Sequence, residues 1–217
     1  MKTVTKVNIG VCAAVLLAVA AVLAITGQPS AVPAASTTAS QPSAIAEGTH
    51  RLDIATDGTV TLVEFLDFEC EVCGAVYPYI EQLREEYAGQ VTFATRYFPI
   101  PGHRNSETSA VAVEAAARQD QFEAMYQKMF QTQATWGESQ DSKAELFRTF
   151  ADELGLDLEQ YDADVADPTT LDRVQSDFDA GRALGVTGTP TIFVNDVMII
   201  LEKPEDLTAA IEAALAQ

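Results

Sequence analysis

Residues 59–73 read Thr-Val-Thr-Leu-Val-Glu-Phe-Leu-Asp-Phe-Glu-Cys-Glu-Val-Cys, and this stretch decides the fold of the chain. Its first ten residues are mostly β-branched, aliphatic or aromatic, which is typical of a strand buried on both faces. From Glu71 to Tyr87 the apolar residues then recur at helical spacing. We therefore predict a buried strand that runs directly into a helix, with Cys70 and Cys73 at the junction.

The sequence on either side supplies the rest of a sheet. Further strand candidates are residues 51–55, 91–97, 191–194 and 197–200. Because the run at 91–97 follows a strand and a helix, it should pair in parallel with the strand at 59–68. The last two candidates predict a hairpin around Asn195-Asp196, followed by a helix from Pro204. The expected class is α/β, with a central mixed β-sheet flanked by helices.

Residues 105–185 are almost entirely helical in pattern and form an insertion between the βαβ half and the ββα half. Ser142 and Glu145 match a capping box, and Asp167-Pro168 opens another helix. That helix is predicted to turn three apolar residues inward: Leu171, Val174 and Phe178. The aromatic residues of the block are interpreted as core rather than as a ligand site: Phe122, Tyr126, Phe130 and Trp136.

The composition indicates one globular domain with a tail. The chain has 217 residues, of which 47% are hydrophobic and 21% charged. The formal net charge of -19 argues against nucleic acid as a partner, because phosphate backbones are bound through lysine and arginine. The acidic surface is expected to keep the domain soluble.

The N-terminal segment indicates export. Lys2 and Lys6 precede the uncharged apolar run 9–25, which is the layout of a signal or membrane anchor with its N-terminus inside. We expect residues 1–26 to be a retained single anchor in the cell membrane. Cleavage after Ala24 or Ala34, with secretion, is the alternative. Cys12 lies in this segment and has no assigned role.

A linker and the folded domain follow the anchor. Residues 27–49 are rich in Pro, Ala, Ser and Thr and predict a flexible tether, so the domain is expected to occupy residues 50–217 on the extracytoplasmic side.

Cys70 and Cys73 are the expected reactive pair. A thiol at a helix N-terminus faces unpaired backbone N–H groups and the positive end of the helix dipole, which stabilise its thiolate. Three residues on, the second thiol lies on the same helix face, within reach of a small disulfide ring. Cys70 is therefore expected to attack a partner's sulfur, and Cys73 to resolve the mixed disulfide.

The sequence gives less support to two other interpretations of the pair. A zinc site would need two more ligands, and only His50 and His103 remain outside the anchor, so no metal and no cofactor are expected. An inert structural disulfide would close so small a loop that it would constrain little chain. His103, in a Pro-Gly-His-Arg loop, is interpreted as an ordinary loop histidine.

Two further residues favour catalysis. Pro190 stands just before the strand candidate at 191–194, which suits a rigid and cis turn. Glu64 lies inside the most apolar strand, where an ionised carboxylate is costly. We expect its pKa to be raised, so that it can exchange a proton with the resolving thiol. A strand-end glutamate that reaches solvent is the alternative.

These motifs resemble the DsbA-like thioredoxin-fold family, in the membrane-tethered branch found in Gram-positive bacteria. The resemblance covers residues 50–217 and rests on 65–73, on Arg96-Tyr-Phe-Pro99 and on Gly185-Val-Thr-Gly-Thr-Pro-Thr191. It implies a thioredoxin fold, a nucleophilic Cys70, a resolving Cys73 and a cis proline at Pro190. It also implies that Thr189 offers backbone contacts to a bound peptide and that Glu64 is the buried acid of the fold.

The dipeptide between the cysteines departs from the best-known members of that family. Glu71-Val72 replaces Pro-His, and both residues are expected to face the substrate. Glu69 and Glu71 flank Cys70 and should disfavour its ionisation, so the pair should be less oxidising than the Pro-His members.

The expected function is an extracytoplasmic thiol–disulfide oxidoreductase that forms disulfides in exported proteins. Its partners are exported proteins with cysteine thiols and a membrane redox partner that resets the pair. A reductase or isomerase on the same scaffold is the alternative. A tethered binding module without turnover is a further one, although binding alone needs no thiol.

Overall fold

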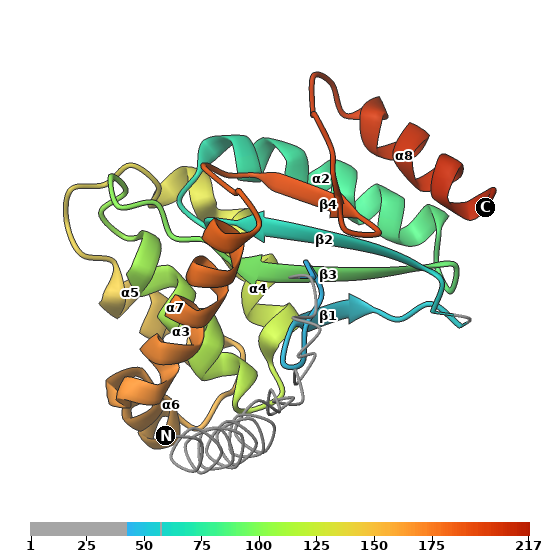
Figure 1. The fold of residues 1–217 in the computed structure, drawn as a ribbon. Helices are drawn as coiled ribbons and strands as arrows, with labels where there is room; N and C mark the ends of the chain where they lie inside the picture. The colour runs from blue at the N-terminus through green and yellow to red at the C-terminus, as the bar shows by residue number, and fades with distance from the viewer. Residues whose placement is uncertain (1–42, 57) are drawn as a thin grey trace, which may run out of the picture. The chain divides into compact units, whose positions relative to one another are not determined.

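Five strands form one mixed sheet in the order β1-β3-β2-β4-β5 within residues 43–56 and 58–217, the part of the chain that this computed structural model describes (Figure 1). The strands are β1 His50–Asp53, β2 Val60–Leu66, β3 Val91–Tyr97, β4 Thr191–Val194 and β5 Val197–Met198. β2 runs parallel to β3, with Val60 opposite Val91, whereas β1, β4 and β5 pair antiparallel with their neighbours. The predicted βαβ unit, the hairpin and the α/β class are therefore confirmed.

Helices lie against the sheet and form a separate block beside it (Figure 1). Their bounds are α2 Glu71–Glu86, α3 Ser106–Ala117, α4 Phe122–Thr132, α5 Ala144–Glu153, α6 Leu158–Ala166, α7 Pro168–Ala183 and α8 Glu205–Leu215, with a short 3₁₀ helix, η1, at Gln133–Thr135. Helices α3 to α7 occupy the predicted insertion at 105–185.

The two faces of β2 explain how the sheet is covered. Val60 and Leu62 pack with buried residues of α2 and α8, such as Ile80 and Ile211. Phe65 points to the other face, where it packs with Phe98, Phe193 and the partly buried Phe178 of α7. The strand is buried on both faces, as its continuous apolar sequence predicts.

The helical insertion builds its own core around aromatic side chains. Trp136 and Tyr126 are fully buried, and Trp136 packs edge-on against Phe147 with ring centroids 4.9 Å apart. The same cluster includes Cys70 and Cys73. The interpretation of the aromatic residues as core is confirmed, and the reactive pair lies where this core meets the end of β2.

The inward face of α7 differs from the prediction. Leu171 is 39% exposed, and the buried residues of the helix are Thr170, Val174, Asp177 and Gly181. Two contacts impose this register: the buried Asp177 pairs with Arg96 at 2.6 Å, and a Cβ on Gly181 would lie 3.0 Å or less from the rings of Phe65 and Phe98. A core ion pair and a close helix–sheet approach therefore outweigh the burial of Leu171.

The start of α5 also differs from the prediction. The helix begins at Ala144. Its N-cap residue, Lys143, donates its backbone N–H to the side chain of Asn105, 2.8 Å away. The Ser142 hydroxyl accepts from the N–H of Ala144 at 3.4 Å. A distant asparagine thus supplies an acceptor at the start of the helix, and Ser142 accepts from Ala144 instead of from Glu145 as a capping box would require.

The folded domain includes residues before the expected boundary at residue 50. Ala44 is fully buried, its backbone N–H donates to Asp196 at 2.7 Å, and its carbonyl accepts from Arg96 at 3.2 Å. Residues 44–49 are therefore part of the domain. The predicted anchor at 1–26, Cys12 and the linker up to residue 42 lie outside the described residues. Among the helices of the described residues, none is both long and apolar enough to span a membrane.

Candidate active site

Cys70 and Cys73 lie at the start of α2, as predicted. Cys70 is the residue immediately before the helix, and Cys73 lies in its first turn. Both are free thiols; Cys70 keeps 6% of its surface exposed and Cys73 none. The turn from β2 holds the pair in place, because the N–H of Cys70 donates to the Asp67 carbonyl at 3.1 Å. A partner's sulfur can therefore approach Cys70 but not Cys73.

The environment of Cys70 favours its thiolate. A hydrogen bond with the Cys73 side chain is the largest influence, and burial opposes it. The backbone N–H groups of Cys73 and Val72 add to the first effect, and the balance lowers the pKa of Cys70 to about 5. Donors at a helix start thus outweigh the expected effect of the flanking carboxylates.

The environment of Cys73 favours its neutral thiol. Burial is the largest influence, and the hydrogen bond to Cys70 and the charges of Glu64 and Cys70 act in the same direction. These effects raise the pKa of Cys73 well above its usual range. The pair is therefore divided into an ionised sulfur near the surface and a protonated sulfur inside.

The turn before β4 faces the pair. The Thr189–Pro190 peptide bond is cis, as the sequence predicts, and the Cys70 thiol donates to the Thr189 carbonyl at 3.4 Å. The position is fixed by the sheet, since Thr191 of β4 pairs with Phe65 of β2. The buried Thr189 hydroxyl has no partner among the described residues.

Glu64 lies in the middle of β2 and is 2% exposed, so it does not reach solvent as a strand-end glutamate would. Burial, followed by the charges of Cys70 and Glu81, raises the pKa of Glu64 to about 8. The carboxyl therefore holds a proton at neutral pH. In its ionised form the Glu64 carboxylate raises the pKa of Cys73, which places it within electrostatic reach of the resolving thiol.

The dipeptide Glu71-Val72 is exposed beside Cys70. Val72 has 54% of its surface exposed, which is unusual for an apolar side chain and leaves it free to touch a partner. A hydrogen bond between the two side chains lowers the pKa of Glu71 and raises the pKa of Glu138. Glu69 behaves differently from the expectation: it is buried, and its carboxylate accepts from the N–H of Asn105.

Three residues that support the site were not predicted. Gln133 of η1 donates through Nε2 to the carbonyls of Phe68 and Cys70, at 2.7 and 2.9 Å. It can approach because residue 74 is glycine, where a Cβ would lie 1.9 Å from the Gln133 side chain. The other two residues are Asp67 and His103, whose side chains form an ion pair at 2.6 Å.

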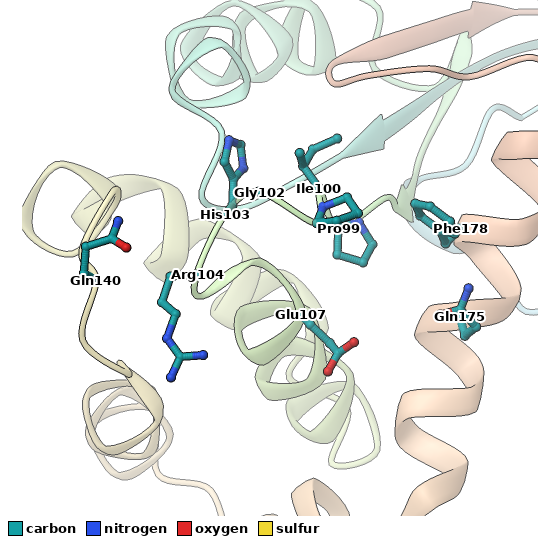
Figure 2. A pocket seen from close by; sticks show the side chains of 10 residues that line it. Pro99, Ile100, Gly102, His103, Arg104, Glu107, Gln140, Gln175 and Phe178 are labelled. Atoms are coloured by element: carbon teal, nitrogen blue, oxygen red, sulfur yellow. The ribbon is translucent and has the colours of Figure 1, made fainter.

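The loop after β3 borders a cavity of about 450 Å³ next to the site (Figure 2). Residues 99–104 form one wall, and Gln140, Gln175 and Phe178 contribute from the insertion. No group of three or more His, Cys, Asp or Glu side chains within the described part of the chain is arranged to hold a metal ion. The nucleophilic groups that the site presents are the free thiols of Cys70 and Cys73.

Known proteins share this fold. The family model described as Thioredoxin matches residues 55–213. BdbD from Bacillus subtilis (oxidised) superimposes with a TM-score of 0.69 at 24% identity, covering 82% of this chain and 97% of that chain. A thioredoxin-like oxidoreductase from Silicibacter pomeroyi DSS-3 gives a TM-score of 0.64 at 26% identity, covering 78% and 93%.

Curated relatives are longer proteins. The Na(+)/H(+) antiporter NhaA 3 of Salinispora tropica is 35% identical over 140 residues, which are 64% of this chain and 20% of the antiporter. The chain thus spans about a fifth of the length of the curated relatives it matches. From its fold, its Cys70–Cys73 pair and the match over residues 55–213, the chain belongs to the thioredoxin family and has the fold of the DsbA-like thiol–disulfide oxidoreductases.

Proposed function

We propose that this chain is a thiol–disulfide oxidoreductase that forms disulfides in exported proteins. The observation that carries the proposal is the division of the pair, with a stabilised thiolate at Cys70 and a buried neutral thiol at Cys73. A stabilised thiolate favours the dithiol form, and a couple whose reduced form is favoured is an oxidant.

The oxidised pair would act in two steps. A substrate thiolate attacks the Cys70 sulfur, the bond between Cys70 and Cys73 breaks, and Cys73 leaves as a thiolate that takes the proton of Glu64. A second substrate thiol then loses its proton to solvent and attacks the substrate sulfur of the mixed disulfide. Cys70 leaves as a thiolate. The substrate gains a disulfide and the pair gains two electrons.

A peptide substrate would lie between the exposed Val72 and the Thr189–Pro190 turn. The Thr189 carbonyl already faces the Cys70 sulfur, and the unpartnered Thr189 hydroxyl is a group that a bound backbone can satisfy. Glu71 borders the same opening. A membrane redox partner would accept the two electrons from the dithiol and restore the disulfide.

The location proposed is the outer face of the cell membrane, with residues 1–26 as the anchor. The support is the order of Lys2, Lys6 and the apolar run 9–25. Fractionation of cells tests this: the intact chain in the membrane fraction is expected, and mature protein in the medium that starts at Ile25 or Ala35 would show cleavage.

The direction of the reaction is tested by the redox potential of the Cys70/Cys73 couple, measured by equilibration with glutathione. We expect a value between roughly -120 mV, the strong-oxidant case, and about -270 mV, the thioredoxin case. A value at or below the thioredoxin potential would replace the oxidase with a reductase. Cys→Ser variants at both positions distinguish an enzyme from a binding module, since a module keeps its function without thiols.

A further inference from the structure

Asp67 connects the active-site turn to the loop that follows β3. One oxygen of its buried carboxylate accepts from the N–H of Glu69 at 2.9 Å, and the other accepts from the N–H of Ile100 at 3.1 Å. The second oxygen also pairs with Nδ1 of His103 at 2.6 Å. The Asp67 carbonyl, in turn, accepts from the N–H of Cys70. His103 and Cys70 are thus held by the same residue.

The hydrogen bond to Asp67 fixes the position of the His103 ring. Its side chain is 31% exposed and borders the cavity next to the site. Figure 2 shows the side chains of His103 and Arg104 leaving the loop in opposite directions, so the two neighbouring basic residues do not share one environment. Of these two side chains, that of His103 is the one hydrogen-bonded to Asp67 of the active-site turn.

The charges around His103 are mostly negative. Its acidic neighbours are Asp67, Glu69 and Cys70 of the turn, Glu71 of α2, Glu138 after η1 and Glu107 of α3. The neighbouring cation is Arg104 of the same loop. Burial opposes protonation of the ring. The hydrogen bond and charge of Asp67, with the charges of Cys70 and Glu69, outweigh burial and raise the pKa of His103 above its usual value.

We propose that His103 is a positioning residue for the redox reaction: its imidazolium, held by Asp67, places a positive charge near the Cys70 sulfur and stabilises the dithiol form. The inference rests on the proposed thiol–disulfide exchange at Cys70. It assigns to a loop histidine the charge that the dipeptide Glu71-Val72 lacks, and it makes the oxidising strength of the pair dependent on pH.

The expected pH window follows from the reciprocity of the two charges. If the Cys70 thiolate raises the pKa of His103, the imidazolium favours the thiolate by the same factor. The thiolate exists only above the Cys70 pKa of about 5, and the imidazolium is lost as the pH rises through the raised pKa of His103. The stabilisation is therefore present between these limits and absent in alkaline solution.

The test compares His103→Gln with the wild type in glutathione buffers at pH 6 and pH 9. Two glutathione thiols reduce the Cys70–Cys73 disulfide to a thiolate and a thiol, giving glutathione disulfide and one proton. Loss of an opposite charge that acts on Cys70 is expected to raise the pKa of this thiol by about one unit. At pH 6 the Cys70 thiol is then almost fully ionised in the wild type and about half ionised in the variant, so we expect the equilibrium constant for reduction to fall roughly fivefold, which corresponds to about 20 mV. At pH 9 the two proteins should agree.

Two more variants serve as controls. His103→Lys keeps a positive charge at both pH values. Its equilibrium constant for reduction should therefore equal that of the wild type at pH 6 and exceed it at pH 9. Arg104→Gln removes the neighbouring cation and should change neither value. An unchanged constant in His103→Gln at pH 6, or an equal loss at both pH values, would overturn the proposal, because a structural role does not depend on the charge of the ring.

Nuclear magnetic resonance gives an independent measurement on the wild-type chain. The sequence has two histidines, His50 and His103, so His103→Gln identifies the ring signals. The pKa of His103 should be higher in the dithiol than in the disulfide form. Equal His103 values in the two forms would also refute the proposal. The absolute potential of the wild type tests the direction of the reaction separately, since a reductase could still show the His103 effect.

Discussion

The buried carboxyl of Glu64 makes the stability of the reduced domain depend on pH. In the folded chain its pKa is about 8, compared with the usual 4.5. Between these values the folded state retains a proton that the unfolded chain releases, so the free energy of unfolding falls as the pH rises. The contribution is complete below pH 4.5 and lost by about pH 8. Each pH unit in this window is worth about 1.4 kcal/mol.

Glu64→Gln removes this dependence, because the amide is neutral at every pH. From pH 5.5 to pH 7.5 the wild type should lose about 3 kcal/mol relative to the variant, which is two pH units at about 1.4 kcal/mol each. The assay is urea unfolding of both proteins at several pH values, with a reductant present. The exposed Glu85→Gln on α2 is the matched control and should differ from the wild type by no more than about 0.5 kcal/mol.

The oxidised protein provides a second comparison. Part of the raised pKa of Glu64 comes from the charge of Cys70, and a disulfide carries none. The difference between Glu64→Gln and the wild type should therefore change less with pH when the pair is oxidised. A difference that stays constant from pH 5.5 to 7.5 in the reduced proteins would show that Glu64 is not the titrating group, and the proton transfer to Cys73 would lose its basis.

Four other predictions concern the pair and its supports. Cys73→Ser should accumulate mixed disulfides with thiol-bearing proteins on non-reducing gels, whereas Cys70→Ser should not; equal trapping by both would remove the assignment of roles. The alkylation rate of Cys70 should be half-maximal near pH 5, and Cys73→Ala should move this midpoint upward because it removes the largest stabilising contact. Gly74→Ala and Gln133→Ala should each lower the free energy of unfolding by about 1–3 kcal/mol, and the double variant should lose less than the sum, since the clash then disappears; strict additivity would contradict the contact. Asp177→Ala leaves the buried Arg96 unpaired and should cost about 3–5 kcal/mol in urea unfolding, while the exposed Asp179→Ala on the same helix should cost little.

The sequence was sufficient for the parts of the fold that follow one periodicity. The strand at 60–66, the helix from Glu71 and the strand at 91–97 lie where continuous β-rich runs and helical spacing place them. The predicted inward face of α7 was wrong because the buried face includes Asp177, and a pattern of apolar residues places an aspartate in solvent. The predicted cap of α5 was wrong because the acceptor for the N–H of Lys143 is Asn105, which is 38 residues away in the sequence.

The reactive atoms of the site were predictable, but the residues around them were not. Two cysteines at a helix start, a proline before a strand and a glutamate in an apolar strand are local signals. His103 was interpreted as a loop residue because its partner Asp67 is 36 positions away, and Gln133 is 65 positions from the Phe68 carbonyl that it contacts. Contacts of this kind are set by how the elements pack, and no spacing within the sequence encodes them.

The hydrogen bonds of Gln133 have a consequence for local opening. They join the turn that carries Cys70 to η1, which lies at the end of α4 in the insertion. Opening of the turn must then break contacts in both the sheet and the helical block, so the two should exchange amide hydrogens with solvent as one cooperative unit. In Gln133→Ala, the amides of Cys70 and Gly74 should exchange faster than those of α4.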